Sequence, residues 1–285
     1  MIKKILFISI VFWLFGIISG YADSISFLVL NMKGEPEAEK QWKPLANYLQ
    51  NQIGQKVQLD FVANAGFVKR SMGHDILLTN PVNAVIIESQ GVFEIIATLD
   101  HVSQGAFFAG VIIVRKDSSI RALKDLAKKN VGVVNKKFAA GGYMFQVNEL
   151  LDAGLVPGED FVNFTELFNQ KAIIFRVISK GLDAGFIRTG ILESLGSNYD
   201  VSQIRILNRI DEGLPYPRST SVYPHWAILV HKRFSAQIKE KITRILLEIK
   251  PDSEVAKSGK MKGFIPAADY SSIKALIKRI TPLSE

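Results

Sequence analysis

Polar residues suited to holding a small anion follow the short buried strand predicted at residues 75–78. Thr79 and Asn80 can donate and accept hydrogen bonds, and Pro81 stands where a helix can begin. Backbone amides at a helix start are unpaired and carry a positive partial charge, so they favour an anion. The alternative is that Thr79 and Asn80 only cap the helix.

A second candidate is the glycine-rich connector KKFAAGGY at residues 136–143. Gly141 and Gly142 allow the backbone to approach a ligand closely, and exposed amides there can cradle an oxyanion. Tyr143 offers a phenol and a ring face, and Lys136 offers a positive charge. The alternative is a plain connector with a core tyrosine, whose lysines at 136 and 137 simply face solvent.

Arg188 and Thr189 follow a predicted strand at residues 183–187. A guanidinium at this point can clamp an oxyanion through two parallel hydrogen bonds. The alternative is an ion pair of Arg188 with Asp183 or Glu193. Of these residues, Arg188 and Thr189 are the candidate ligand contacts.

Catalytic and metal-binding motifs are missing from the sequence. The histidines form no H-x-x-x-H or H-E-x-x-H pair, and there is neither a G-x-S-x-G elbow nor a G-x-x-x-x-G-K loop. Cysteine is absent, which excludes a thiol nucleophile and a cysteine-bound metal. We therefore predict no catalytic residues, no metal site and no cofactor.

Strand and helix signals alternate along the chain, which predicts an α/β fold. The first series predicts strands at 24–31, 57–62, 75–78 and 93–99, with helices at 37–53, 67–72 and 83–90. The second series predicts strands at 110–114, 130–134, 161–164, 183–187, 204–207 and 225–231, with helices from 119 and at 141–153, 169–179, 190–195, 235–249 and 269–280. Two such series predict two lobes, each a mostly parallel sheet flanked by helices, with a ligand cleft between them.

The first 22 residues have the features of a cleavable secretory signal peptide. A basic start at residues 3–4 precedes an uncharged run over 5–18, and small residues stand at 20 and 22. The alternative is a retained anchor, since 5–22 reaches the lower length limit of a membrane span. Removing 22 of the 285 residues leaves 263 and lowers the net charge from +8 to +6. Without cysteine the chain cannot be a lipoprotein, and we expect a periplasmic protein.

Four segments together resemble a known family: DILLTNP at 75–81, GLDAGFIRT at 181–189, STSVYPHW at 219–226 and GFIPAADY at 263–270. In this order they resemble the phosphate/phosphonate-type periplasmic substrate-binding proteins, and most of all the sensor domains of tetrathionate-sensor-like histidine kinases. The resemblance implies a type II periplasmic-binding-protein fold that closes over a small molecule. It implies two crossings between the lobes, near residues 100–112 and 210–224. We expect lobe 1 to comprise 23–105 and 222–285, and lobe 2 to comprise 106–221.

The resemblance also implies contacts from the second crossing. Tyr223 resembles a hinge aromatic that lines the cleft, and Ser221 lies beside it. Asn31 follows the first strand and reaches the same edge of its sheet. His225 replaces an acidic residue common in the sensor relatives; it either adds pH dependence or serves as a surface or capping residue.

The connector at 136–143 departs from the phosphonate binders. Those proteins have a loop rich in serine and threonine here, whereas this chain has Ala139 and Ala140. The missing hydroxyl donors put phosphate and phosphonate in doubt. The pair Gly142-Tyr143 is closer to the glycine-aromatic pair of the sensor relatives. Oxidised sulfur anions, organic phosphorus compounds and small zwitterions are all left open.

These features predict a monomeric periplasmic solute-binding protein that captures a small anion by lobe closure for an ABC importer. The first alternative is a separate sensor or accessory protein that presents its ligand-bound state to a membrane histidine kinase. A lower alternative is a secreted enzyme on the same fold. A charge of +6 fits either solubility or attraction of an anion, and no arginine-aromatic motif indicates a nucleic-acid partner.

Overall fold

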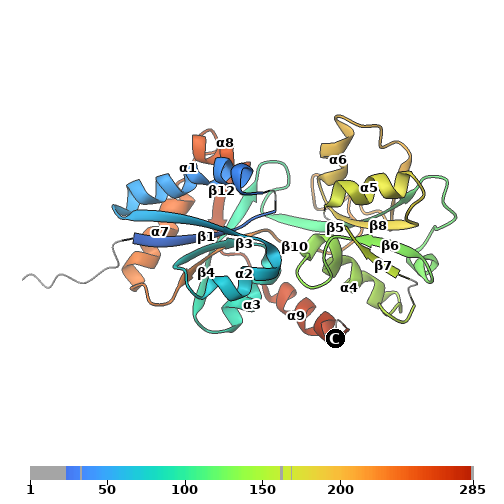
Figure 1. Ribbon diagram of the computed structural model, residues 1–285, viewed down its shortest axis with the longest axis horizontal. Helices are drawn as coiled ribbons and strands as arrows, with labels where there is room; N and C mark the ends of the chain where they lie inside the picture. Colours follow the sequence, from blue (N-terminus) through green and yellow to red (C-terminus); the bar gives the residue numbers. More distant parts are fainter. Residues whose placement is uncertain (1–23, 33, 161–162, 168, 284–285) are drawn as a thin grey trace, which may run out of the picture.

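Two sheets lie side by side along the long axis of the molecule (Figure 1). The computed structural model describes residues 24–32, 34–160, 163–167 and 169–283, so the proposed signal peptide lies outside the described residues. Across the described part of the chain, no helix has the length and hydropathy that a membrane crossing requires.

The first sheet has the strand order β12-β4-β11-β3-β1-β2. Its strands are β1 (Ser24–Leu30), β2 (Lys56–Val62), β3 (Ile76–Thr79), β4 (Phe93–His101), β11 (Ala227–His231) and β12 (Met261–Pro266). β1 pairs in parallel with β2 and β3, whereas β11 runs antiparallel to β3 and β4. β3 is central and buried on both faces, which explains its uninterrupted apolar run.

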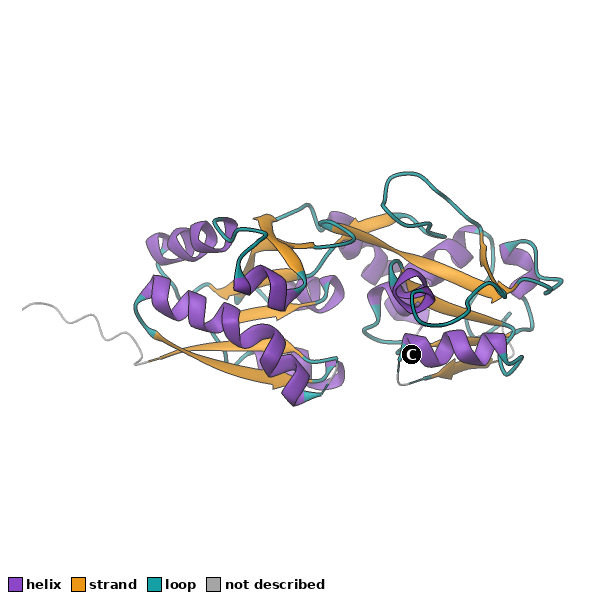
Figure 2. Ribbon diagram, turned by 90° about the horizontal axis from the view of Figure 1, so that it is seen from above, coloured by secondary structure: helices purple, strands orange, loops and turns teal. Residues whose placement is uncertain are grey.

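Helices cover both faces of this sheet (Figure 2). On one face lie α1 (Glu35–Ile53), α7 (Ala236–Leu247) and α8 (Glu254–Gly259). On the other lie α2 (Asn64–Ser71), α3 (Pro81–Ser89) and α9 (Ser271–Ile280). α1 illustrates the pattern, because its buried residues recur at helical spacing: Ala38, Trp42, Leu45, Ala46 and Leu49.

The second sheet has the order β10-β5-β8-β6-β7, with β9 also paired to β5. Its strands are β5 (Phe107–Arg115), β6 (Asn130–Val133), β7 (Asn163–Glu166), β8 (Ala184–Arg188), β9 (Ile204–Leu207) and β10 (Val222–Pro224). One face packs on α4 (Phe145–Asp152), which continues a π-helical turn, η2 (Ala140–Met144). The other packs on α5 (Gln170–Ile178) and α6 (Ile191–Gly196). Two short 3-10 turns are η1 (Leu123–Leu126) and η3 (Thr281–Leu283).

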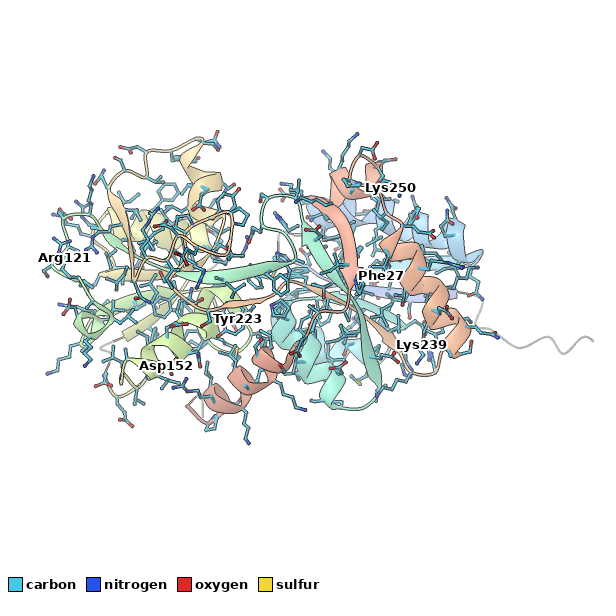
Figure 3. All side chains as sticks on the ribbon, turned by 180° about the vertical axis from the view of Figure 1, so that it is seen from behind. Phe27, Arg121, Asp152, Tyr223, Lys239 and Lys250 are labelled. Atoms are coloured by element: carbon cyan, nitrogen blue, oxygen red, sulfur yellow. The ribbon has the colours of Figure 1, made fainter. Side chains whose placement is uncertain are left out.

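Two crossings join the sheets, one between β4 and β5 and one between β10 and β11. β5 and β10 pair antiparallel, with Tyr223 opposite Phe108. α9 also spans the lobes, since Arg279 donates to Asp152 Oδ1 (2.7 Å) and Asn148 Oδ1 (2.9 Å) on α4. Figure 3 shows Tyr223 between the lobes and Asp152 on the same side of lobe 2 as α9.

The two-lobed α/β architecture is confirmed, but both sheets are mixed. β11 and β12 run against the other strands of the first sheet, and β5 runs against its neighbours β8, β9 and β10. The direction of these reversed strands depends on where the chain crosses between the lobes. A pattern of local βαβ units therefore does not reveal it.

Several predicted elements differ locally from the observed ones. The helix expected from residue 119 is only the turn η1, because Asp125 Oδ2 accepts from the amides of Arg121 (2.7 Å) and Ala122 (2.9 Å). β12 was not anticipated, since its glycine at 263 and proline at 266 are typical of a loop. The strand expected at 161–164 lies partly outside the described residues.

Candidate functional site

The polar residues at the start of α3 bond mainly to one another. Asn80 Oδ1 accepts from the amide of Asn83 (3.0 Å), and Asn83 Nδ2 donates to Thr79 Oγ1 (3.1 Å). Thr79 is fully buried and Asn80 almost so. This is the capping arrangement that the sequence left as the alternative, and a ligand contact by either side chain stays a prediction.

Arg188 ends β8 and lies opposite Gly110 of β5. Its amide donates to Gln170 Oε1 (2.8 Å), and its Nη1 donates to the carbonyl of Thr189 (3.0 Å). With its amide oxygen turned toward the guanidinium, Gln104 accepts a further hydrogen bond from Nη1 (2.6 Å). The guanidinium is thus held by neutral oxygens.

Arg188 lacks a carboxylate partner within ion-pair distance among the described residues; Glu193 acts on it only at longer range. Burial disfavours the charged form and lowers the pKa of Arg188 from 12.5 to about 10. The side chain still carries its proton at neutral pH. In this environment, any anion that replaces the water lost by the guanidinium stabilises its charged form.

The glycine connector packs directly against Arg188. A side-chain carbon at Gly141 would lie 2.9 Å from both Arg188 Cβ and the Phe108 ring, so only glycine fits without displacement. Gln146 Nε2 fixes this approach, because it donates to the carbonyls of Gly141 (2.8 Å) and Ile187 (2.7 Å). The start of η2 is therefore tied to the end of β8.

The π-helical turn begins beside the Arg188 side chain. The amide of Met144 reaches back to the carbonyl of Ala139 (3.0 Å), so the amides of residues 140–143 precede the first bonded position of the helix. Single π turns occur frequently at functional sites. The helix start and the half-buried Arg188 together form a positively polarised corner.

Tyr143 and the lysines of the connector differ in exposure. Tyr143 is buried edge-on against Phe164, at 5.6 Å between centroids, and burial together with Glu166 raises its pKa to about 12. Its phenol is therefore neutral. Lys136 and Lys137 are exposed, and the amide of Lys136 donates to Glu166 Oε1 (3.2 Å).

The residues of the second crossing lie mostly in packed surroundings. Tyr223 is buried and stacks on Phe145 at 4.0 Å between centroids. Burial and nearby carboxylates of α4 raise the pKa of Tyr223 to about 12. Ser221 is exposed and its amide donates to Glu149 Oε1 (2.7 Å). Asn31 Oδ1 accepts from the amide of Gly34 (3.0 Å).

His225 is buried in the second crossing, close to Arg188. Its ring stacks on His101 at 5.5 Å and lies 5.0 Å from Phe108. Burial, His101 and Arg188 together hold the pKa of His225 well below 6.5. Its Nδ1 accepts from the Trp226 amide (2.8 Å), so the neutral ring has its proton on Nε2.

Sequence reasoning missed the side chains that hold this corner together. They belong to no motif and come from three separate elements: Gln104, Gln146 and Gln170. Their role depends on the tertiary approach to β8, which composition and periodicity do not encode. Among the described residues there is also no cluster of three or more potential metal ligands.

The two sheets, the paired crossings and the polarised corner between them define a two-lobed periplasmic binding protein of type II. The chain belongs to the family described as ABC transporter, phosphonate, periplasmic substrate-binding protein, whose model matches residues 27–271. It is 27% identical over 242 residues to the tetrathionate sensor histidine kinase TtrS of Salmonella typhimurium. That match covers 79% of this chain and 40% of the kinase, so the chain spans well under half of that relative.

Solved structures share the fold at low sequence identity. XAC2383 from Xanthomonas citri, bound to ATP, is 15% identical with a TM-score of 0.76, over 93% of this chain and all of that one. PhnD1 from Prochlorococcus marinus, in complex with methylphosphonate, is 17% identical with a TM-score of 0.71, over 91% of this chain and 98% of that one.

Proposed function

We propose that this protein captures a small oxyanion between its lobes and delivers it to an ABC importer as a periplasmic solute-binding protein. The observation that carries the proposal is the half-buried side chain of Arg188, whose guanidinium has neutral oxygen partners and whose Cβ packs against the start of η2 at Gly141. The family membership supports a substrate-binding role. The ligand classes are phosphonate-like or oxidised-sulfur anions.

The proposed mechanism is closure of lobe 1 (23–105 and 222–285) on lobe 2 (106–221), in a monomer released by cleavage after residue 22. Lobe 2 would supply the charge and amides through Arg188 and the connector. Lobe 1 would bring the start of α3 to the other side of the anion. Binding energy gained only in the closed state shifts the population toward that state, which a membrane partner recognises. Binding without turnover is part of the proposal.

A second candidate function is a sensor or accessory role, in which the ligand-bound state is presented to a membrane histidine kinase. It is favoured by the similarity to TtrS, a tetrathionate sensor histidine kinase. Deleting the gene separates the two. Loss of uptake of the bound anion supports the importer role, whereas loss of a transcriptional response with uptake intact supports the sensor role.

The test of binding is a thermal-shift panel on the secreted protein after unfolding and refolding to remove carried-over ligand. The panel contains phosphate, methylphosphonate, thiosulfate, tetrathionate, sulfate and zwitterionic amino acids. A ligand at 100 times its Kd adds about 2.7 kcal/mol. In a chain of this size the melting temperature should then rise by several degrees. A response to no anion would refute the oxyanion proposal.

A further inference from the structure

Gln104 lies in the first crossing, between β4 and β5, and is almost fully buried. Its amide nitrogen lies 3.2 Å from both Thr189 Oγ1 and the Thr189 carbonyl, in the orientation that satisfies both ends of the amide. A carbonyl oxygen only accepts hydrogen bonds, so the nitrogen must face Thr189. The amide oxygen then faces Arg188 Nη1 at 2.6 Å.

The surroundings leave the Gln104 side chain little room to move. Gly190 has a φ of +79°, and a side-chain carbon there would lie 3.1 Å from the end of the Gln104 amide that faces Arg188. Thr189 Oγ1 also accepts from the amide of Ala109 (3.3 Å), which anchors it to the start of β5. Gln104 therefore joins the interlobe crossing to the end of β8 where Arg188 stands.

Arg188 is half-buried, and an arginine withdrawn from water in this way usually has a carboxylate partner. Gln104 occupies the position of such a partner and accepts a hydrogen bond, but it carries no charge. The guanidinium is thus oriented while its positive charge stays uncompensated. A carboxylate of the same shape would neutralise Arg188 and repel an incoming anion.

We propose that Gln104 is a positioning residue for anion binding: it orients Arg188 through a neutral contact and so reserves the charge of Arg188 for the ligand. The inference rests on the proposed function, because it assumes that an anion reaches Arg188. It adds a role for the first crossing, since a movement of Gln104 during lobe closure reorients the guanidinium.

The test compares Gln104→Glu with Gln104→Met in the full-length protein after secretion. Titration calorimetry uses tetrathionate and methylphosphonate as probes. We expect Gln104→Glu to weaken binding at least about 30-fold, because one charged hydrogen bond alone is worth about that much. Gln104→Met, which keeps the charge of Arg188 but not its orientation, should weaken binding by a smaller factor. Gln58→Glu, which adds the same charge at an exposed position of β2, is the control and should bind like the wild type.

The order of the two variants separates this role from a structural one. Glutamate retains an acceptor for Arg188 but sets an oxygen against the Thr189 carbonyl, which methionine does not. Urea unfolding of the ligand-free variants measures that structural cost, and a purely structural role predicts that the loss of affinity follows the loss of stability. Equal or tighter binding by Gln104→Glu than by Gln104→Met, or a loss of affinity that merely parallels the loss of stability, overturns the proposal.

A ligand-free measurement separates failure of this inference from failure of the proposed function. Nitrogen-15 spectra should show slowed rotation of the Arg188 guanidinium in the wild type, assigned through Arg188→Lys, and faster rotation in Gln104→Met. Equal rotation in both overturns the positioning role. Slowed rotation in a wild type that binds neither probe leaves the Gln104–Arg188 contact standing and instead refutes the oxyanion function.

Discussion

Replacing Arg188 with methionine should remove anion binding without destabilising the ligand-free protein. A tenfold change in proton affinity corresponds to 1.36 kcal/mol. The fall of the pKa of Arg188 from 12.5 to about 10 therefore implies that charging it in the folded protein costs about 3 kcal/mol more than in the unfolded chain. Methionine avoids this cost. It also loses the hydrogen bonds to Thr189 and Gln104, worth about 0.5–1.5 kcal/mol each.

The two contributions leave ligand-free Arg188→Met between no net change and a gain in stability of about 2 kcal/mol. Urea unfolding at pH 7 measures this value, and Arg209→Met provides a control at an exposed arginine paired with Asp211. In the same samples, anion affinity should fall about 10- to 150-fold, the value of a charge-assisted hydrogen bond. A loss of 2 kcal/mol or more in stability, or unchanged affinity, would refute the assignment of Arg188 to the ligand.

The same geometry gives three further predictions. Gly141→Ala forces a carbon to within 2.9 Å of Arg188 and Phe108, so calorimetry should show anion binding weakened by about tenfold or more. Gly142→Ala is the matched control and should weaken binding less, because its added carbon has no contact closer than 3.4 Å. Equal effects of the two substitutions would contradict this reasoning. The pKa of His225 in the folded protein lies below its value in the unfolded chain. Below pH 6.5 the unfolded chain therefore takes up a proton that the folded one does not, and the free energy of unfolding falls by up to about 1.4 kcal/mol per pH unit. Urea midpoints between pH 5 and 7.5 should show a shallower slope for His225→Gln, and parallel slopes would count against it. Arg279→Ala breaks an exposed ion pair with Asp152 and should reduce the free energy of unfolding by less than about 1 kcal/mol in urea titrations; a loss above 2 kcal/mol would show that α9 clamps the lobes.

The fold was accessible from the sequence because its signals are local. Alternating strand and helix patterns give the two series of elements, and the run at 76–78 is apolar because β3 is buried on both faces. The reversed direction of β5 and β11 was not accessible, since it depends on which distant strands pair. The sequence predicts an α-helix over 141–153 and does not distinguish the π turn at η2, because glycine and alanine suit either geometry.

The candidate site, like the fold, was predictable from the sequence only where its signals are local. Arg188, Gly141 and Gly142 could be selected because a charge and two glycines at strand ends are visible in sequence, and the structure brings Arg188 and Gly141 into contact. Tyr223 was selected by resemblance, but it stacks on Phe145 in packed surroundings, and its contact with a ligand stays a prediction. Gln104 has no local signal, because its partner stands 84 residues away in the chain.

The route of β5 has a mechanical consequence. This strand begins at the first crossing and pairs with β8 so that Gly110, near its start, lies opposite Arg188. Under the proposed closure, an anion held by Arg188 would pull on lobe 2 close to the first crossing, where β5 begins. Such a short lever arm converts a small displacement at the anion into a wide sweep at the far end of the lobe, where Arg121 lies (Figure 3). We expect a membrane partner that touches this far end to detect occupancy as a change of position, without contacting the ligand.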